Sequence, residues 1–243
     1  MALATSAFAA REARRFVLAD SRFVMPGSAT DNEETTGLVV RGLAYASRAR
    51  VVRVFEDDFG RNVFQIPIGE RRRRLLAVDW VEDASVARIW PNRIEVRIRE
   101  RKPVAFLNLP HDPAHPRTSR PAMIDVEGVI LEQPAKARFS FPIAGGIAAQ
   151  QTERERREKV RLMLRVMRDL GEVAKEVTEI DVSSTEVSIA IGIEGREVEL
   201  LVGDRNYFQR TRNFLDHYPE IRRRSSAVTS FDLRMDDRIT ARE

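Results

Sequence analysis

The most constraining feature of the sequence is a pair of strand patterns at residues 84–89 and 93–99. In the second pattern, Ile94, Val96 and Ile98 alternate with charged residues, so one face of the strand is apolar and the other is charged. An apolar face must be shielded from water by a second layer of structure. The chain therefore predicts a sheet with helices packed on one side.

Two short helices before these strands are expected to supply that layer. Ser47 stands where a helix N-cap is expected, and the helical apolar period that follows it ends at Gly60. An apolar run at residues 38–40 comes before the first helix and predicts a further strand. Residues 37–107 thus predict a domain with the order strand, helix, helix, strand, strand.

The second helix contains four consecutive arginines at residues 71–74. We expect these arginines to be solvated, while Leu75, Leu76 and Val78 are buried. A basic run can also bind nucleic acid, but the apolar residues that follow make a solvated helix face the favoured interpretation.

A proline-rich stretch at residues 109–120 predicts a loop. It contains His111 and His115, and four-residue spacing can place two imidazoles on one helix face. Prolines break that geometry, and the chain has no Cys and only one further histidine, His217. We therefore predict no metal site and no cofactor.

The second half of the chain alternates between strand and helix patterns. Residues 123–131 predict a hairpin with Gly128 at its turn, and residues 153–170 predict an amphipathic helix capped by Gly171. Residues 108–243 therefore predict a second α+β domain, with an antiparallel sheet and two packed helices. The remaining elements expected are strands at 177–182, 187–193 and 198–202, a helix at 207–218, and strands at 230–234 and 238–241.

Residues 1–36 are expected to form an N-terminal arm that is partly extended, with a polar loop at residues 28–36. Arginines interrupt the first apolar stretch long before the roughly 20 residues that a membrane helix needs. No membrane helix is therefore expected in this arm.

Four motifs in the first domain resemble the POTRA domain of the FtsQ/DivIB family of bacterial cell-division proteins. Each also has a physical role, because Trp80 fills the junction between helix and sheet and the sequence Trp90-Pro91-Asn92 makes a hairpin corner. The motifs are Gly60-Arg61-Asn62-Val63-Phe64, Asp79-Trp80-Val81-Glu82-Asp83-Ala84, Trp90-Pro91-Asn92-Arg93-Ile94 and Glu100-Arg101-Lys102-Pro103-Val104-Ala105.

The resemblance continues in the second half and covers residues 37–243. It rests there on Ile124-Asp125-Val126-Glu127-Gly128-Val129, Phe141-Pro142-Ile143-Ala144-Gly145 and Phe231-Asp232-Leu233-Arg234. The chain departs from the family in one respect, because the membrane helix that should precede the POTRA domain is not found in it.

The resemblance implies a non-catalytic scaffold that links early and late division proteins at the division septum. It implies an inner-membrane protein with a single membrane pass and these domains in the periplasm. Its partners would be proteins of the FtsB/FtsL type, which add a β-strand to an exposed sheet edge. Whether the chain also forms a weak homodimer stays open.

Carried onto this chain, the partner-binding edge strand runs along the last residues of the sequence. Arg234 is the favoured single contact, because a guanidinium group can bind a partner carboxylate through two hydrogen bonds. The residues that the resemblance assigns are Ser230, Phe231, Leu233, Arg234, Met235, Ile239, Thr240 and Ala241.

The sequence suggests three alternatives to a division scaffold. POTRA domains also occur in outer-membrane assembly and secretion proteins that handle client β-strands, but this chain shows one POTRA pattern and no barrel-like strand array. Arginine-rich runs at residues 71–74, 154–157 and 222–224 suggest nucleic-acid binding, which is disfavoured by the interspersed acids and by the absence of aromatic residues interleaved with these runs. No nucleophile, phosphate-loop or metal motif supports an enzyme.

Overall fold

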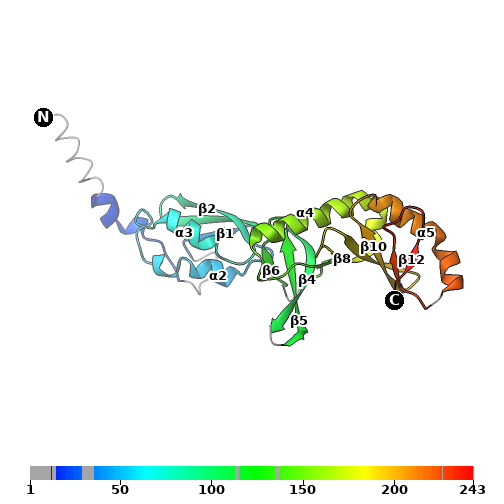
Figure 1. The fold of residues 1–243 in the computed structure, drawn as a ribbon. Helices are drawn as coiled ribbons and strands as arrows, with labels where there is room; N and C mark the ends of the chain where they lie inside the picture. Colours follow the sequence, from blue (N-terminus) through cyan, green and yellow to red (C-terminus); the bar gives the residue numbers. More distant parts are fainter. Residues whose placement is uncertain are drawn as a thin grey trace. The chain divides into compact units, whose positions relative to one another are not determined.

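The computed structural model divides the chain into two compact units, Met1–Arg101 and Lys102–Glu243 (Figure 1). The domain boundary expected after residue 107 falls inside a strand of the second unit, β4 (Pro103–Asp112). The structure describes residues 12, 15–28, 36–112, 115–134, 137–225 and 227–242. Most of the loop expected at residues 28–36 lies outside these residues.

The first unit has the expected order of strand, two helices and two strands. Its sheet has the order β1-β3-β2, with β1 parallel to β3 and β2 antiparallel to β3. Side chains from the helices and the sheet, among them Val51, Leu75 and Val96, are fully buried between the two layers. The elements are β1 (Leu38–Arg41), α2 (Arg48–Arg53), η2 (Glu56–Asp58), α3 (Ile68–Leu75), β2 (Val81–Ile89) and β3 (Arg93–Glu100).

Both helices of this unit differ in detail from the prediction. The Ser47 hydroxyl caps the first helix as expected, but α2 ends at Arg53 and the 3-10 helix η2 follows it before Gly60. In α3, Arg71 is buried and Leu76 is exposed. Periodicity alone placed Arg71 in water, because it does not reveal that a buried carboxylate lies beside it.

Two residues of the family motifs, Glu100 and Trp80, join the end of β3 to other parts of the first unit. The Glu100 carboxylate accepts hydrogen bonds from the backbone N–H groups of Ala44, Tyr45 and Ala46, at 2.7–3.0 Å. Trp80 is buried at the helix-to-sheet junction, as predicted, and its carbonyl accepts the Arg101 N–H at 2.9 Å. These residues of the motifs therefore stabilise the fold.

The described part of the N-terminal arm, which was predicted to be partly extended, is helical at first and has extended backbone at Val24. Residues 15–19 are helical and the 3-10 helix η1 (Ser21–Phe23) follows them. The Asn62 side-chain amide donates to the carbonyls of Val17 and Leu18, at 2.8 and 3.3 Å, and so binds the end of that helical segment. Phe23 and Met25 are buried, which fixes the arm to the first unit.

The second unit contains one nine-stranded sheet with the order β12-β11-β10-β9-β8-β7-β4-β5-β6. It is a mixed sheet, and the expectation of an antiparallel sheet was wrong in this respect. Strand β7 is parallel to both β4 and β8, and β10 is parallel to β11. The predicted meander β8-β9-β10 is antiparallel, as expected. Its strands are β8 (Val177–Asp181), β9 (Val187–Ile193) and β10 (Arg196–Gly203), and β7 spans Ile143–Gly145.

Most of the stretch expected to be a proline-rich loop lies in the two strands of a long hairpin. Strand β4 pairs antiparallel with β5 (His115–Asp125), and β5 also pairs with β6 (Ile130–Glu132). The loop prediction for residues 109–120 was therefore wrong. The hairpin tolerates Pro110 because the register of its two strands shifts between Pro110 and Asp112. The side chains of His111 and His115 lie outside the described part of the chain.

Two long helices pack on the second sheet. Helix α4 (Glu153–Leu170) has the predicted bounds, begins with a capping box between Thr152 and Glu155, and ends at Gly171. Helix α5 (Tyr207–Arg224) continues past the predicted end at residue 218 through Pro219, which is exposed. Apolar side chains of both helices share one core with the sheet, and α4 runs along the sheet in Figure 1.

Candidate functional site

The last residues of the chain form two strands at the end of the nine-stranded sheet. Strand β11 (Ser230–Asp232) lies between β10 and β12 (Thr240–Ala241), parallel to the first and antiparallel to the second. The segment that the resemblance implied to be a single edge strand therefore consists of two short strands joined by a turn. Among the described strands, β12 has a neighbour on one side only, so its other side is the edge of the sheet.

The residues predicted for partner binding divide into a buried set and an exposed set. Phe231 and Leu233 are each only 2% exposed, and the Phe231 ring lies 5.0 Å from that of Phe214 in the core. These two residues anchor the site from within. Ser230 and Ile239 are half-buried, and the exposed residues are Arg234, Met235, Thr240 and Ala241.

Arg234 is held by two carboxylates of its own chain. Its guanidinium donates to Asp232 at 2.7–3.1 Å and to Glu186 at 2.9–3.1 Å. Hydrogen bonds from Arg234 lower the pKa of Asp232, and the bonds to Asp232 and Glu186 raise the pKa of Arg234. Arg234 therefore ties the start of the β11–β12 turn to the loop before β9, and its donors already have partners.

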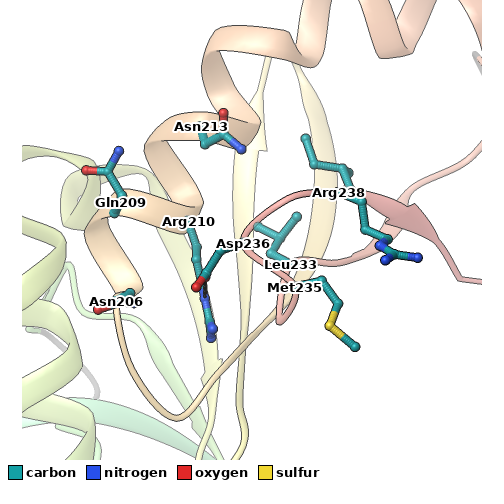
Figure 2. Close-up of a pocket in the computed structure, with 9 residues that line it drawn as sticks. Asn206, Gln209, Arg210, Asn213, Leu233, Met235, Asp236 and Arg238 are labelled. Atoms are coloured by element: carbon teal, nitrogen blue, oxygen red, sulfur yellow. Dashed lines mark hydrogen bonds and ion pairs between the residues drawn. The ribbon is translucent and has the colours of Figure 1, made fainter.

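A pocket of about 370 Å³ opens beside the β11–β12 turn. Figure 2 shows polar residues of α5 on one side and residues of the turn on the other. Arg210 is buried and donates to the Asp236 carboxylate at 2.9 Å and to the Val202 carbonyl at 2.8 Å. The pocket thus combines an apolar wall with a polar rim. Its lining residues are Asn206, Gln209, Arg210, Asn213, Leu233, Met235, Asp236, Arg238 and Ile239.

Gly203 allows the two arginines of this region to approach the sheet. Its φ is +90°, a conformation that favours glycine. A Cβ atom there would lie 2.9 Å from the Arg210 guanidinium and 3.1 Å from the Cγ of Arg234. The glycine at the end of β10 is therefore required for the geometry of the pocket and the turn.

A second hollow lies on the sheet face formed by β8, β9, β10 and β11, and carries four carboxylates. Burial raises the pKa of Glu179, and the nearby charges of Glu197, Asp181 and Glu199 raise it further. Among the described residues, no group of three or more metal-binding side chains is placed to hold a metal ion.

The sequence reasoning missed the contribution of α5 to the site. The helix was identified only as a packing element, whereas Asn206, Gln209, Arg210 and Asn213 line the pocket. Their spacing of three, four and seven residues places them on one helix face. A polar stripe at that spacing, next to the apolar stripe that packs on the sheet, is the signal that would have identified them.

The comparisons with known proteins point to one family. The family model for the FtsQ-type POTRA domain matches residues 37–101, which form most of the first unit. The cell division protein FtsQ of Koribacter versatilis is 32% identical over 215 residues, which cover 85% of this chain and 59% of that protein. The FtsQ of Alcanivorax borkumensis is 25% identical over 185 residues, which cover 72% of this chain and 62% of that protein.

A third relative, the FtsQ of Bordetella pertussis, is 39% identical over 64 residues, which cover 26% of this chain and 23% of that protein. The chain therefore spans less than two thirds of the length of each of these relatives. None of the described helices is both long and apolar enough to cross a membrane. The family-model match and the similarity along both units agree with the POTRA motifs, and the chain belongs to the FtsQ/DivIB family of cell division proteins.

Proposed function

We propose that this chain is a non-catalytic scaffold of the cell-division machinery, which binds a partner by adding that partner's strand to β12. The observation that carries the proposal is the free edge of β12 beside the pocket of α5. Family membership supports the division role, since the relatives are named as division proteins. Association of this kind requires no reacting group.

The pattern of hydrogen bonds identifies which backbone groups of β12 point away from the sheet. The Arg242 N–H donates to the Ser230 carbonyl at 2.8 Å, so it points into the sheet. Successive residues of a strand point their backbone groups in opposite directions, and the N–H and carbonyl of Ala241 therefore point outward. A partner strand would pair with β12 through these groups of Ala241.

The pocket adds side-chain selectivity to this backbone pairing. An apolar side chain of the partner strand would contact Met235 and Ile239, the two apolar lining residues of the pocket that are not fully buried. The amides of α5 would bind polar groups beside it. Arg234 stabilises the β11–β12 turn through its ion pairs with Asp232 and Glu186. We therefore assign it a positioning role in place of the direct partner contact that the sequence suggested.

The proposal includes the identity and location of the complex. The partners would be division proteins of the FtsB/FtsL type, at the division septum. The protein would be attached to the inner membrane by a single-pass helix, with both units in the periplasm. Sequencing the gene upstream of Met1 tests the anchor, because an in-frame run of about 20 apolar residues is expected there.

The partner-binding edge is tested by removing one outward-facing donor. Replacing Ala241→Pro deletes the N–H that faces the partner and leaves the Arg242 bond to Ser230 in place. We expect affinity for a purified FtsB/FtsL-type complex, measured by calorimetry, to fall by roughly tenfold or more.

The control is Ala241→Ser, which keeps the donor and should bind as the parent chain does. A second variant, Arg234→Glu, should weaken binding by releasing the turn from Glu186. Undiminished binding by both the Ala241→Pro and Arg234→Glu variants would show that β12 is not the partner site.

A further inference from the structure

The first unit carries a group of exposed apolar side chains at one end of its β2–β3 hairpin. Trp90, at the corner between the strands, is 75% exposed, Phe64 is 46% exposed and Ile89 is 43% exposed. Phe23 lies beneath them, with its ring 5.3 Å from that of Phe64 and 6.3 Å from that of Trp90. We call Phe64, Ile89 and Trp90, together with Phe23, the aromatic tip.

The aromatic tip is held in place by an arginine from β2. Arg88 donates from Nε to the Val63 carbonyl and from Nη2 to the Ile66 carbonyl, each at 2.7 Å. These bonds join the hairpin to the connector that contains Phe64. Phe23 is only 8% exposed and supports both outer rings from below. The exposed rings are therefore presented on a fixed base.

The segments that supply the exposed side chains of the aromatic tip carry three arginines, of which Arg61 also pairs with Asp58 at 3.4 Å. Residues 59–67 and 86–94, which supply its exposed side chains, contain Arg61, Arg88 and Arg93 and no Asp or Glu. Ile89 pairs across the strands with Arg93, which is exposed beside it. The aromatic tip is therefore an apolar projection with a cationic rim.

The rest of the same sheet shows the opposite pattern. On β3, Arg97 pairs with Glu95 and Arg99 pairs with Glu82 on β2, at 3.0 and 2.8 Å. Most of the exposed face of the hairpin is thus neutralised pair by pair, and only its end lacks acids. An apolar group beside an exposed arginine, Arg93, matches the chemistry of an anionic lipid surface, where aromatic rings occupy the headgroup level and arginines bind phosphate.

We propose that the aromatic tip docks on an anionic phospholipid bilayer. Trp90 enters the headgroup region first, since it is the most exposed side chain of the aromatic tip. Phe64 and Ile89 follow on either side, and Arg93 contacts lipid phosphates. A projecting corner is suited to this occupant, because a bilayer adapts to its shape whereas a protein partner needs a matching hollow. The proposal does not depend on the partner-binding edge at β12.

The tryptophan content of the chain provides a direct test. The chain has two tryptophans, and Trp80 is only 3% exposed, so a lipid-induced change in tryptophan emission reports on Trp90. The complete 243-residue chain is titrated with vesicles of phosphatidylcholine, with or without phosphatidylglycerol. We expect a blue shift and vesicle co-sedimentation with the anionic vesicles, and about tenfold weaker binding or more for Trp90→Ser.

Two further variants separate lipid docking from other effects. Arg93→Glu should weaken binding to anionic vesicles, and added salt should have the same effect, because the rim acts through charge. The matched control is Phe208→Ser, which removes an aromatic side chain of similar exposure, 41%, from α5. It should bind vesicles as the parent chain does.

Three results would overturn the proposal. The first is an unchanged emission spectrum with anionic vesicles, and the second is equal vesicle binding by the Trp90→Ser and parent chains. The third is a blue shift that appears without lipid and grows with protein concentration, which would assign the aromatic tip to contacts between copies of the chain. Thermal melting of each variant checks that Trp90→Ser still folds, and Phe64→Ser repeats the test at a second position.

Discussion

Each of the two units of this protein contains a buried arginine, and the two arginines are held in different ways. In the first unit, Arg71 meets Asp58, and the two side chains are 5% and 0% exposed, with their atoms 2.5 and 2.9 Å apart. In the second unit, Arg156 is satisfied mainly by backbone carbonyls, including that of Gly128 at 2.7 Å. A charge held by one carboxylate depends on a single side chain, whereas one held by carbonyls depends on the course of the backbone. The site of Arg71 should therefore be more sensitive to one substitution than the site of Arg156.

The largest expected effect follows from breaking the buried pair. Replacing Asp58→Ala leaves the Arg71 guanidinium buried without its carboxylate, and we expect the first unit to lose about 3–5 kcal/mol of stability. Hydrogen exchange measured by mass spectrometry can locate the change, because it reports protection region by region. Protection should fall in residues 37–101 and stay unchanged in the second unit.

The matched control is Asp57→Ala, at the exposed neighbour in the same 3-10 helix, and it should be nearly neutral. The double variant Asp58→Ala with Arg71→Met removes both charges and should recover most of the loss. Equal protection in the Asp58→Ala and Asp57→Ala variants would contradict the difference drawn between the two units.

A smaller effect is expected where the second unit brings two arginines close to its backbone. Gly203→Ala places a Cβ against Arg210 and Arg234 at a φ of +90°, and should destabilise the end of the sheet by about 1–3 kcal/mol. Gly192→Ala is the control, since a Cβ there meets nothing within 4 Å. A loss of thermal stability by both variants alike would show that the crowding at Gly203 is not the cause.

The smallest expected effect concerns the pH dependence of the second unit. Burial raises the pKa of Glu179 above its ordinary value of 4.5, so the folded chain binds a proton more tightly than the unfolded chain. This group's contribution to stability is complete below that value and is lost as pH rises through the folded pKa. Glu179→Gln keeps the neutral form, and should gain in melting temperature over the parent chain as pH rises from 4 to 7.

The control for this pH profile is Glu220→Gln, in an exposed ion pair with Arg224 on α5. Its melting temperature should follow the parent chain across the same range, apart from the small contribution of a surface pair. A constant difference between the Glu179→Gln and parent chains at every pH would mean that the carboxylate does not titrate differently on folding.

Local patterns in the sequence predicted the helices and hairpins that depend on nearby residues. Helix α4 was predicted with its observed bounds, because its apolar stripe and the Gly171 cap are encoded within the segment itself. The β5–β6 hairpin was also predicted, since Gly128 and the Asp125 carboxylate, which accepts the Glu127 and Val129 N–H groups, form the turn locally.

Features that depend on distant residues were not predicted. The pairing of β7 with β4 and β8 joins segments far apart in the chain, and alternation within a strand does not reveal its neighbours. For the same reason the terminal segment was taken as one edge strand, although β11 lies inside the sheet. The burial of Arg71 has the same origin, because its carboxylate lies on another element of the chain.

The attachment of the N-terminal arm has a mechanical consequence. The arm is joined to the connector by bonds between backbone groups, among them Met25 N–H to the Arg61 carbonyl and Val63 N–H to the Phe23 carbonyl, each at 2.9 Å. Together with the bonds of the Asn62 amide, these bonds must all break before the arm can move along the connector. A pull on the chain before residue 17 would therefore be transmitted to the first unit through these bonds.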